Sequence, residues 1–122
     1  MQDNYFDSIR ENAVECLFEL NKLASILEKK KALTRIEYAA SERFLQVLIE
    51  SAIGCAKQKC KKINNFTPND AYESFQKLFD AELISARDLE QWKKIVGLRN
   101  VIVHDYLNID HAVIDRLLLQ KS

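Results

Sequence analysis

The chain has 122 residues, of which 48% are hydrophobic and 30% are charged, and its 18 basic and 18 acidic side chains give a net charge of zero. Such a balance argues against strong, sequence-independent affinity for nucleic acid. Two glycines and one proline are too few for the many turns of an all-β fold, so the composition favours helices. We expect one domain over residues 1–122, because a chain of this length buries a single core.

No stretch of the chain approaches the ~20 apolar residues of a membrane-spanning helix, and its polar, acidic start differs from a secretory signal. We therefore expect a cytoplasmic protein that does not enter the membrane. The cysteines, Cys16, Cys55 and Cys60, form neither an even set nor a C-x-x-C pair. They are expected to be reduced packing residues.

Two long helices are predicted in the first half of the chain, over about residues 4–30 and 34–62. Apolar residues recur there at helical spacing, and Thr34 followed by Glu37 is a capping-box pattern that begins the second helix. The two helices should pack as an antiparallel hairpin. The apolar positions that define them are Phe6, Ile9, Ala13, Leu17, Leu20, Ala24 and Leu27, which we expect to face the core, and then Ile36, Ala40, Phe44, Val47, Leu48 and Cys55.

A short third helix is predicted after a loop over residues 63–66 and should end at Phe79. Thr67 is expected to cap it, Pro68 to occupy its first position and Asp70 to lie in its first turn. These residues mark the turn between the helical hairpin and the rest of the chain.

The fourth predicted helix begins at Ser85 and Asp88, a second capping pair, and places an arginine on an apolar stripe. An isolated buried guanidinium is costly, so Arg99 should open into a cleft or pair with an acid, for which the second helix is a candidate source. The stripe consists of Leu89, Trp92, Val96, Arg99 and Val103.

A last helix, capped by Asn108 or Asp110, is predicted from Val113, Leu117 and Leu118. Together these segments predict an all-α protein, an up-and-down four-helix bundle with a short additional helix.

Residues 99–106 gather side chains suited to cleavage of an RNA phosphodiester. Histidine titrates near neutrality, so His104 can take the proton of an attacking 2′-hydroxyl or give a proton to the leaving 5′-oxygen. The guanidinium of Arg99 offers paired N–H donors to the charge that builds on the phosphoryl oxygens. Asn100 lies one helical turn before His104 and can orient the imidazole. For an isolated Arg and His, an ion pair and a hydrogen-bonded core histidine are the commoner roles.

Arg99 and His104 lie roughly 140° apart around an ideal helix, so they do not share a face. Three arrangements can join them: the helix loosens near His104, the arginine reaches around, or the same segment of a second chain completes the site. The residues by themselves leave all three open, and a two-fold dimer, which the third requires, is the commonest oligomer.

The order of Arg99, Asn100, His104 and Tyr106 resembles the motif of the HepT-like branch of the HEPN superfamily. The resemblance implies a small helical ribonuclease toxin whose two protomers pair so that their motifs line one cleft. For this reason we favour the arrangement in which a second chain completes the site. It also implies a partner, a minimal nucleotidyltransferase antitoxin that transfers AMP to Tyr106 and silences the nuclease. A phosphate beside Arg99 would occupy the guanidinium and block the RNA backbone.

Glu42, Arg43 and Gln46 form a polar cluster on the second helix, where the resemblance implies an acidic-basic-glutamine pattern that helps to line the cleft. An ordinary solvated helix face explains these three residues equally well. Of the three, Arg43 is expected to lie nearest the RNA.

No spacing typical of metal ligands occurs, so we expect metal-independent cleavage without a cofactor, which leaves a 2′,3′-cyclic phosphate and a 5′-hydroxyl. The alternative is a non-catalytic module that docks on a nucleotidyltransferase, or that grips a nucleotide phosphate with Arg99 and His104. The complete motif favours the nuclease, because a scaffold has no chemical need for Tyr106.

Overall fold

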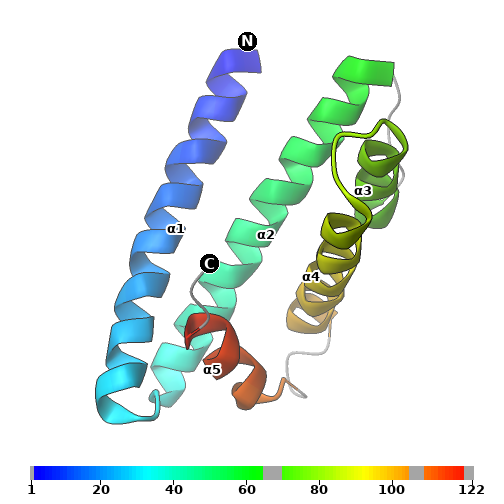
Figure 1. Cartoon of the computed structure of the whole chain (residues 1–122). Helices are drawn as coiled ribbons and strands as arrows, with labels where there is room; N and C mark the ends of the chain where they lie inside the picture. Colours follow the sequence, from blue (N-terminus) through cyan, green and yellow to red (C-terminus); the bar gives the residue numbers. More distant parts are fainter. Residues whose placement is uncertain (1, 65–69, 105–108, 120–122) are drawn as a thin grey trace.

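The computed structural model describes residues 2–64, 70–104 and 109–119, and all regular secondary structure in these ranges is helical (Figure 1). α1 and α2 are long, α3 and α5 are short, and α4 carries the arginine of the motif. The bounds are α1 Gln2–Lys30, α2 Arg35–Asn64, α3 Ala71–Asp80, α4 Ala86–His104 and α5 His111–Leu119. The predicted all-α class and the predicted order of helices are confirmed.

α2 is the helix around which the others are arranged (Figure 1). It runs antiparallel to α1 on one side and to α4 on another, and it packs against every other helix. Within the described ranges α4 packs against neither α1 nor α5. The bundle is therefore open between α1 and α4, and α2 takes part in two separate cores.

The two cores divide the helices between them. The first joins α1, α2 and α5 through Leu20, Leu23, Leu27, Leu33, Tyr38, Ile114 and Leu118. The second joins α2, α3 and α4 through Ile49, Ile53, Ala56, Cys60, Ala71, Phe75, Leu78, Leu89 and Val96. In this second core the rings of Phe75 and Trp92 stack with centroids 4.5 Å apart, which fixes α3 against α4. The second core thus holds the motif-bearing helix on α2.

Both predicted capping boxes are confirmed. Thr34 and Glu37 each accept a hydrogen bond from the backbone N–H of the other, at 3.1 and 2.9 Å. Ser85 and Asp88 make the same reciprocal pair at the start of α4. Each pair satisfies two backbone donors that a helix start leaves without an intrahelical acceptor.

α3 begins later than predicted. Asp70 is its N-cap, with an extended backbone (φ −145°, ψ 177°) and a side chain that accepts the N–H of Glu73 at 2.8 Å. The prediction of Asp70 as a first-turn acid was wrong, because an aspartate at the N-cap satisfies a free backbone donor. Thr67 and Pro68 lie outside the described residues. α2 also runs to Asn64, into the segment predicted as a loop.

α5 is capped by Asp110, which accepts a backbone N–H of the first turn at 2.9 Å. This confirms one of the two predicted caps, while Asn108 lies outside the described residues. Tyr38 on α2 donates a 2.7 Å hydrogen bond to Oδ1 of Asp115, and its ring stacks on His111 with centroids 3.8 Å apart. These contacts attach α5 to α2 just after the motif.

Three residues of the predicted apolar stripes, Leu17, Ile36 and Val103, lie at the surface instead, Val103 with 37% exposure. Leu17 is 47% exposed and Ile36 is 81% exposed. Leu17 lies on a face of α1 that no helix fully covers, and Ile36 lies in the first turn of α2. Helical spacing identifies an apolar stripe, but it does not say how much of the stripe a neighbouring helix covers.

The cysteines are packing residues, as predicted: Cys16 and Cys60 are buried and Cys55 is half-buried, all as free thiols. Burial is the main cause that raises the pKa of each thiol, which favours the neutral form. Cys60 also donates to the carbonyl of Ser74 at 3.3 Å and so links α2 to α3. In the described part of the chain no helix has the length and apolar character to cross a membrane.

Candidate active site

The last turns of α4 present three of the four motif residues. The side chain of Arg99 is 23% exposed, Asn100 is half-buried, and His104 is exposed. α4 is continuous through His104, so the arrangement in which the helix loosens does not occur up to this residue. Tyr106 lies outside the described residues.

Arg99 is held between α2 and its own helix. Its Nη1 lies 3.7 Å from Oε2 of Glu50 on α2, and its Nε donates a 2.9 Å hydrogen bond to Oδ1 of Asn100. The other oxygen of Glu50 accepts a long hydrogen bond of 3.5 Å from Nε2 of Gln46. The prediction that an acid of the second helix pairs with Arg99 is confirmed. We call Gln46, Glu50, Arg99 and Asn100 the Arg99 network.

The network orients the guanidinium and leaves most of it available to a ligand. A guanidinium has five N–H donors. Among the described residues, Asn100 accepts from one of them and Glu50 faces a second, so three have no partner there. A phosphate can accept two parallel hydrogen bonds from such an edge. The arrangement therefore presents a fixed cation with open donors at the half-buried boundary between α2 and α4.

The hydrogen bond to Asn100 turns Arg99 toward the face of α4 that carries His104, because residues 100 and 104 are one turn apart. α4 runs antiparallel to α2, and His104 lies about 7.5 Å beyond Arg99 along the axis of α4, in the direction in which α2 has its N-terminus. Among the described residues no hydrogen bond or ion pair joins Arg99 to His104. One chain brings the two to the same side without joining them.

The three residues of the polar cluster predicted on the second helix have different surroundings. Gln46 belongs to the Arg99 network, whereas Glu42 is half-buried and forms no hydrogen bond or ion pair within the described part of the chain. Arg43 is exposed and lines a hollow between α1 and α2 with Cys16, Phe44 and other residues. Burial is the main cause that raises the pKa of Cys16, and the positive charge of Arg43 opposes that rise. This opposing effect agrees with the position of Arg43 beside α1.

Glu50 is the candidate residue that sequence reasoning did not single out. A signal was present, because Arg43, Gln46 and Glu50 recur at spacings of three and four and so form a polar stripe on α2. The stripe does not say which of its members meets Arg99. Only the packing of α4 on α2 selects Glu50 as the partner.

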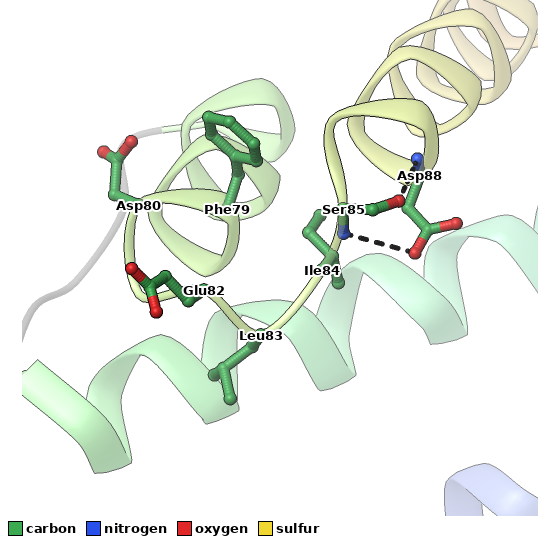
Figure 2. Close-up of a pocket in the computed structure, with 7 residues that line it drawn as sticks. All are labelled: Phe79, Asp80, Glu82, Leu83, Ile84, Ser85 and Asp88. Carbon is green, nitrogen blue, oxygen red and sulfur yellow. Dashed lines mark hydrogen bonds between the residues drawn. The ribbon is translucent and has the colours of Figure 1, made fainter.

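A second hollow lies at the turn between α3 and α4 (Figure 2). Asp88 is engaged there in its capping pair with Ser85, which the dashed lines mark, and the carboxylates of Asp80 and Glu82 make the hollow acidic. Such a charge disfavours phosphate, and Asp88 precedes Arg99 by about 16 Å along α4. The lining residues are Phe79, Asp80, Glu82, Leu83, Ile84, Ser85 and Asp88. Nowhere in the described ranges do three His, Cys, Asp or Glu side chains gather as metal ligands would.

Comparison with known proteins assigns the chain to a family. The profile of the family described as Ribonuclease HepT-like matches residues 13–121. The mRNA nuclease HepT of Shewanella oneidensis is 32% identical over 111 residues, which cover 77% of this chain and 81% of that protein. The chain therefore belongs to the HepT-like ribonuclease family, and the resemblance noted in the sequence is confirmed.

Two solved structures share the fold. A chain of a toxin-antitoxin crystal structure with AMP-PNP superimposes with a TM-score of 0.83, covers 93% of this chain and 86% of its own length, and is 20% identical. YutE, a cytosolic protein of unknown function from Bacillus subtilis, superimposes with a TM-score of 0.61 over 89% of this chain and 77% of its own, at 18% identity. At such identities the likeness concerns the fold alone.

Proposed function

We propose that this protein is a metal-independent endoribonuclease toxin that acts as a homodimer and is silenced by a nucleotidyltransferase antitoxin. Membership of the HepT-like ribonuclease family supports the nuclease. The relative named an mRNA nuclease supports an RNA substrate, and the similar chain from a toxin-antitoxin structure supports an antitoxin partner. The observation that carries the proposal is Arg99, which presents open donors on the side of α4 that carries His104.

In the proposed reaction, the RNA 2′-hydroxyl attacks the adjacent phosphorus. His104 takes the hydroxyl proton, a bond forms between the 2′-oxygen and phosphorus, and the bond from phosphorus to the 5′-oxygen breaks. The 5′-oxygen takes a proton from solvent, so the products are a 2′,3′-cyclic phosphate and a 5′-hydroxyl. Arg99 stabilises the negative charge on the phosphoryl oxygens, while Asn100 and Glu50 position its guanidinium.

We place the complete site between two protomers. No hydrogen bond or ion pair joins Arg99 to His104 within the described part of one chain, although both lie near the end of α4. In a two-fold dimer, Arg99 of one protomer acts together with His104 of the other. The same pairing brings a second copy of Arg99 to the cleft, while the dimer, like one chain, keeps a net charge of zero.

Digestion of a mixed cellular RNA in the presence of a chelator tests the nuclease. Wild-type protein should cut and leave cyclic phosphate ends, whereas His104→Ala and Arg99→Ala proteins should not. His111→Ala protein is the matched control, because His111 is the other histidine of the chain and stands outside the motif. Cutting by His104→Ala protein, or 5′-phosphate ends, would contradict the mechanism. RNA binding without any cutting would favour the non-catalytic module.

Tyr106 is the proposed acceptor of AMP. Its hydroxyl attacks the α-phosphorus of ATP on the antitoxin, an oxygen–phosphorus bond forms, and pyrophosphate leaves. Incubation with the nucleotidyltransferase and ATP should add the mass of AMP and stop RNA cleavage, because the new phosphate would compete with the RNA backbone for Arg99. Tyr106→Phe protein should gain no mass, while Tyr72→Phe protein should be modified as wild type. A modified protein that still cuts RNA would refute this regulation.

A further inference from the structure

Tyr72 on α3 lies against α4 at a position where α4 has no side chain. The residue is 40% exposed, and its hydroxyl lies 3.7 Å from the point that a Cβ of Gly97 would occupy. The tip of the side chain therefore lies over helix backbone, while the residue as a whole remains exposed.

Gly97 shares a stripe of α4 with the motif. Positions 93, 97, 100 and 104 are separated by four, three and four residues, which places them on one side of a helix. Lys93 is exposed at one end of the stripe, and its 3.8 Å contact with Glu90 is a solvent-exposed pair that leaves its charge largely available. The stripe thus combines a cation, a bare backbone beside an aromatic ring, an amide and an imidazole.

The fold of the chain does not itself require a glycine at position 97. Glycine destabilises a helix interior relative to alanine. A Cβ at this position would meet the Tyr72 hydroxyl at an ordinary contact distance, so an alanine fits. The glycine therefore has no packing purpose within one chain, and without a Cβ the backbone of α4 beside the Tyr72 hydroxyl has no side chain of its own.

The platform is held in place before any ligand arrives. Phe75, one turn after Tyr72, stacks on Trp92 of α4, and the carbonyl of Ser74 accepts a hydrogen bond from Cys60 of α2. α3 is thus fixed to both neighbouring helices around Tyr72. A ring that is already positioned loses little conformational freedom when a flat ligand stacks on it.

We propose that Tyr72 is a base-stacking platform for single-stranded RNA. A nucleobase near the scissile phosphate stacks on the Tyr72 ring, while Lys93 and Arg99 meet the sugar-phosphate backbone. Gly97 lies about 10.5 Å from His104 along α4, a distance that a few nucleotides of single strand span. The inference rests on the proposed nuclease site, because it assigns the neighbouring nucleotide of that substrate. A free nucleotide has the same stacking chemistry, so the test must separate the two.

Binding of an RNA strand that cannot be cleaved tests the proposal. The probe is a fluorescein-labelled oligoadenylate of about ten nucleotides with 2′-O-methyl groups, followed by fluorescence anisotropy. Tyr72→Ala should weaken binding by roughly fivefold to 150-fold, the range for loss of a base-stacking aromatic. Tyr72→Phe keeps the ring and should bind as wild type. Phe18→Ala is the matched control, because Phe18 is 60% exposed but lies on α1.

Two further arms identify the ligand. With an abasic version of the strand, wild-type and Tyr72→Ala proteins should bind equally, because there is no base to stack. AMP alone should displace the strand weakly, since it lacks the extended backbone. AMP that binds as tightly as the strand, with the same dependence on Tyr72, would assign the platform to a free nucleotide and overturn the proposal.

Equal binding of the strand by wild-type and Tyr72→Ala proteins overturns the proposal, as does a Tyr72→Phe protein that binds as weakly as Tyr72→Ala. A changed molecular mass of Tyr72→Ala protein in sedimentation also overturns it, because Tyr72 would then lie between two copies of the chain. The strand cannot be cut, so the result does not depend on catalysis. If the protein cuts RNA but Tyr72→Ala does not weaken RNA binding, only the stacking proposal is contradicted. If the protein does not cut RNA but Tyr72→Ala weakens binding, only the proposed reaction is contradicted.

Discussion

Arg99 meets two anions in the proposed cycle, the carboxylate of Glu50 in the free protein and a phosphate of the RNA. The pair with Glu50 spans 3.7 Å, and the side chain of Glu50 is 43% exposed, so solvent screens the attraction. Exposed pairs of this kind contribute at most about 1 kcal/mol to stability. The contact therefore contributes little to stability. It positions the guanidinium of Arg99, and an incoming phosphate must compete with the carboxylate of Glu50.

Glu50→Gln should tighten the binding of uncleavable RNA by up to about fivefold, which corresponds to about 1 kcal/mol. The amide keeps an acceptor for Arg99 but removes the charge that competes with phosphate. The same anisotropy titration measures the effect. The free energy of unfolding should change little, because the pair is exposed. Weaker RNA binding would show instead that the charge of Glu50 holds Arg99 in its RNA-binding position.

Tyr38 supplies a pH-dependent contribution to stability. Its hydrogen bond to Asp115, with burial and the nearby negative charge as lesser causes, raises the pKa of the Tyr38 phenol above its usual value. The neutral phenol is the form that the fold stabilises. The contribution is therefore complete below the ordinary phenol pKa of about 10 and is lost as the pH rises through the raised pKa of the folded protein.

Tyr38→Phe should lower the free energy of unfolding by about 1–2 kcal/mol at neutral pH, because a partly buried hydrogen bond to a carboxylate is lost. The difference from wild type should shrink above about pH 10. Urea unfolding at neutral and alkaline pH measures both values. Tyr72→Phe serves as the control and should match wild type throughout. A loss that stays constant across this range would argue against the assigned pKa shift.

α4 has a well-capped first turn but contains a glycine, which lowers its intrinsic helix propensity further along. Ser85 and Asp88 fix its first turn, and Val96 is fully buried against α2 and α3. Gly97 follows directly and lowers the intrinsic helix propensity at the position that faces Tyr72. Residues 101–103 are β-branched and favour a strand locally. Packing by α2 and α3 therefore keeps α4 helical through these residues and on to His104.

Gly97→Ala should raise the free energy of unfolding by about 0.5–1 kcal/mol, since the new Cβ enters ordinary contact with Tyr72 and the helix gains propensity. Urea denaturation checks this value. If RNA approaches the bare backbone, the same variant should also bind the uncleavable strand less tightly. A destabilised variant would mean that Tyr72 and α3 cannot adjust even slightly.

At the scale of the whole molecule, the open arrangement around α2 decides what one chain can do. α2 packs against α1 and α5 in one core and against α3 and α4 in the other, and Arg99 reaches Glu50 at the edge of the second core. His104 is exposed beyond that edge. The proposed site thus has its cation anchored within one chain, while its proton acceptor is open to a second chain.

Mixed dimers test whether the site spans two protomers. Arg99→Ala and His104→Ala proteins should each be inactive, but co-expressed together they should recover about a quarter of wild-type activity. Half of the dimers are then mixed, and each mixed dimer has one complete site out of two. Ribonuclease assays on the co-purified mixture measure the recovery. No recovery despite demonstrated mixed dimers would place Arg99 and His104 of one site in the same chain.

The sequence alone determined the helices, most of their caps and the order of the motif residues. Thr34 with Glu37 and Ser85 with Asp88 act within one turn, so their pairing depends only on neighbours along the chain. The position of Arg99 on an apolar stripe also predicted that it pairs with an acidic side chain. These features follow from local geometry, which residue spacing encodes directly.

The tertiary structure decided which residues from distant segments meet. Glu50, rather than Glu42, faces Arg99 because α4 crosses α2 at that level, and Tyr72 lies over Gly97 because the stacked rings of Phe75 and Trp92 fix α3 there. The exposure of Leu17 and Ile36 was decided in the same way. A stripe on one helix defines a direction, but the partner that covers it depends on the packing of all the helices together.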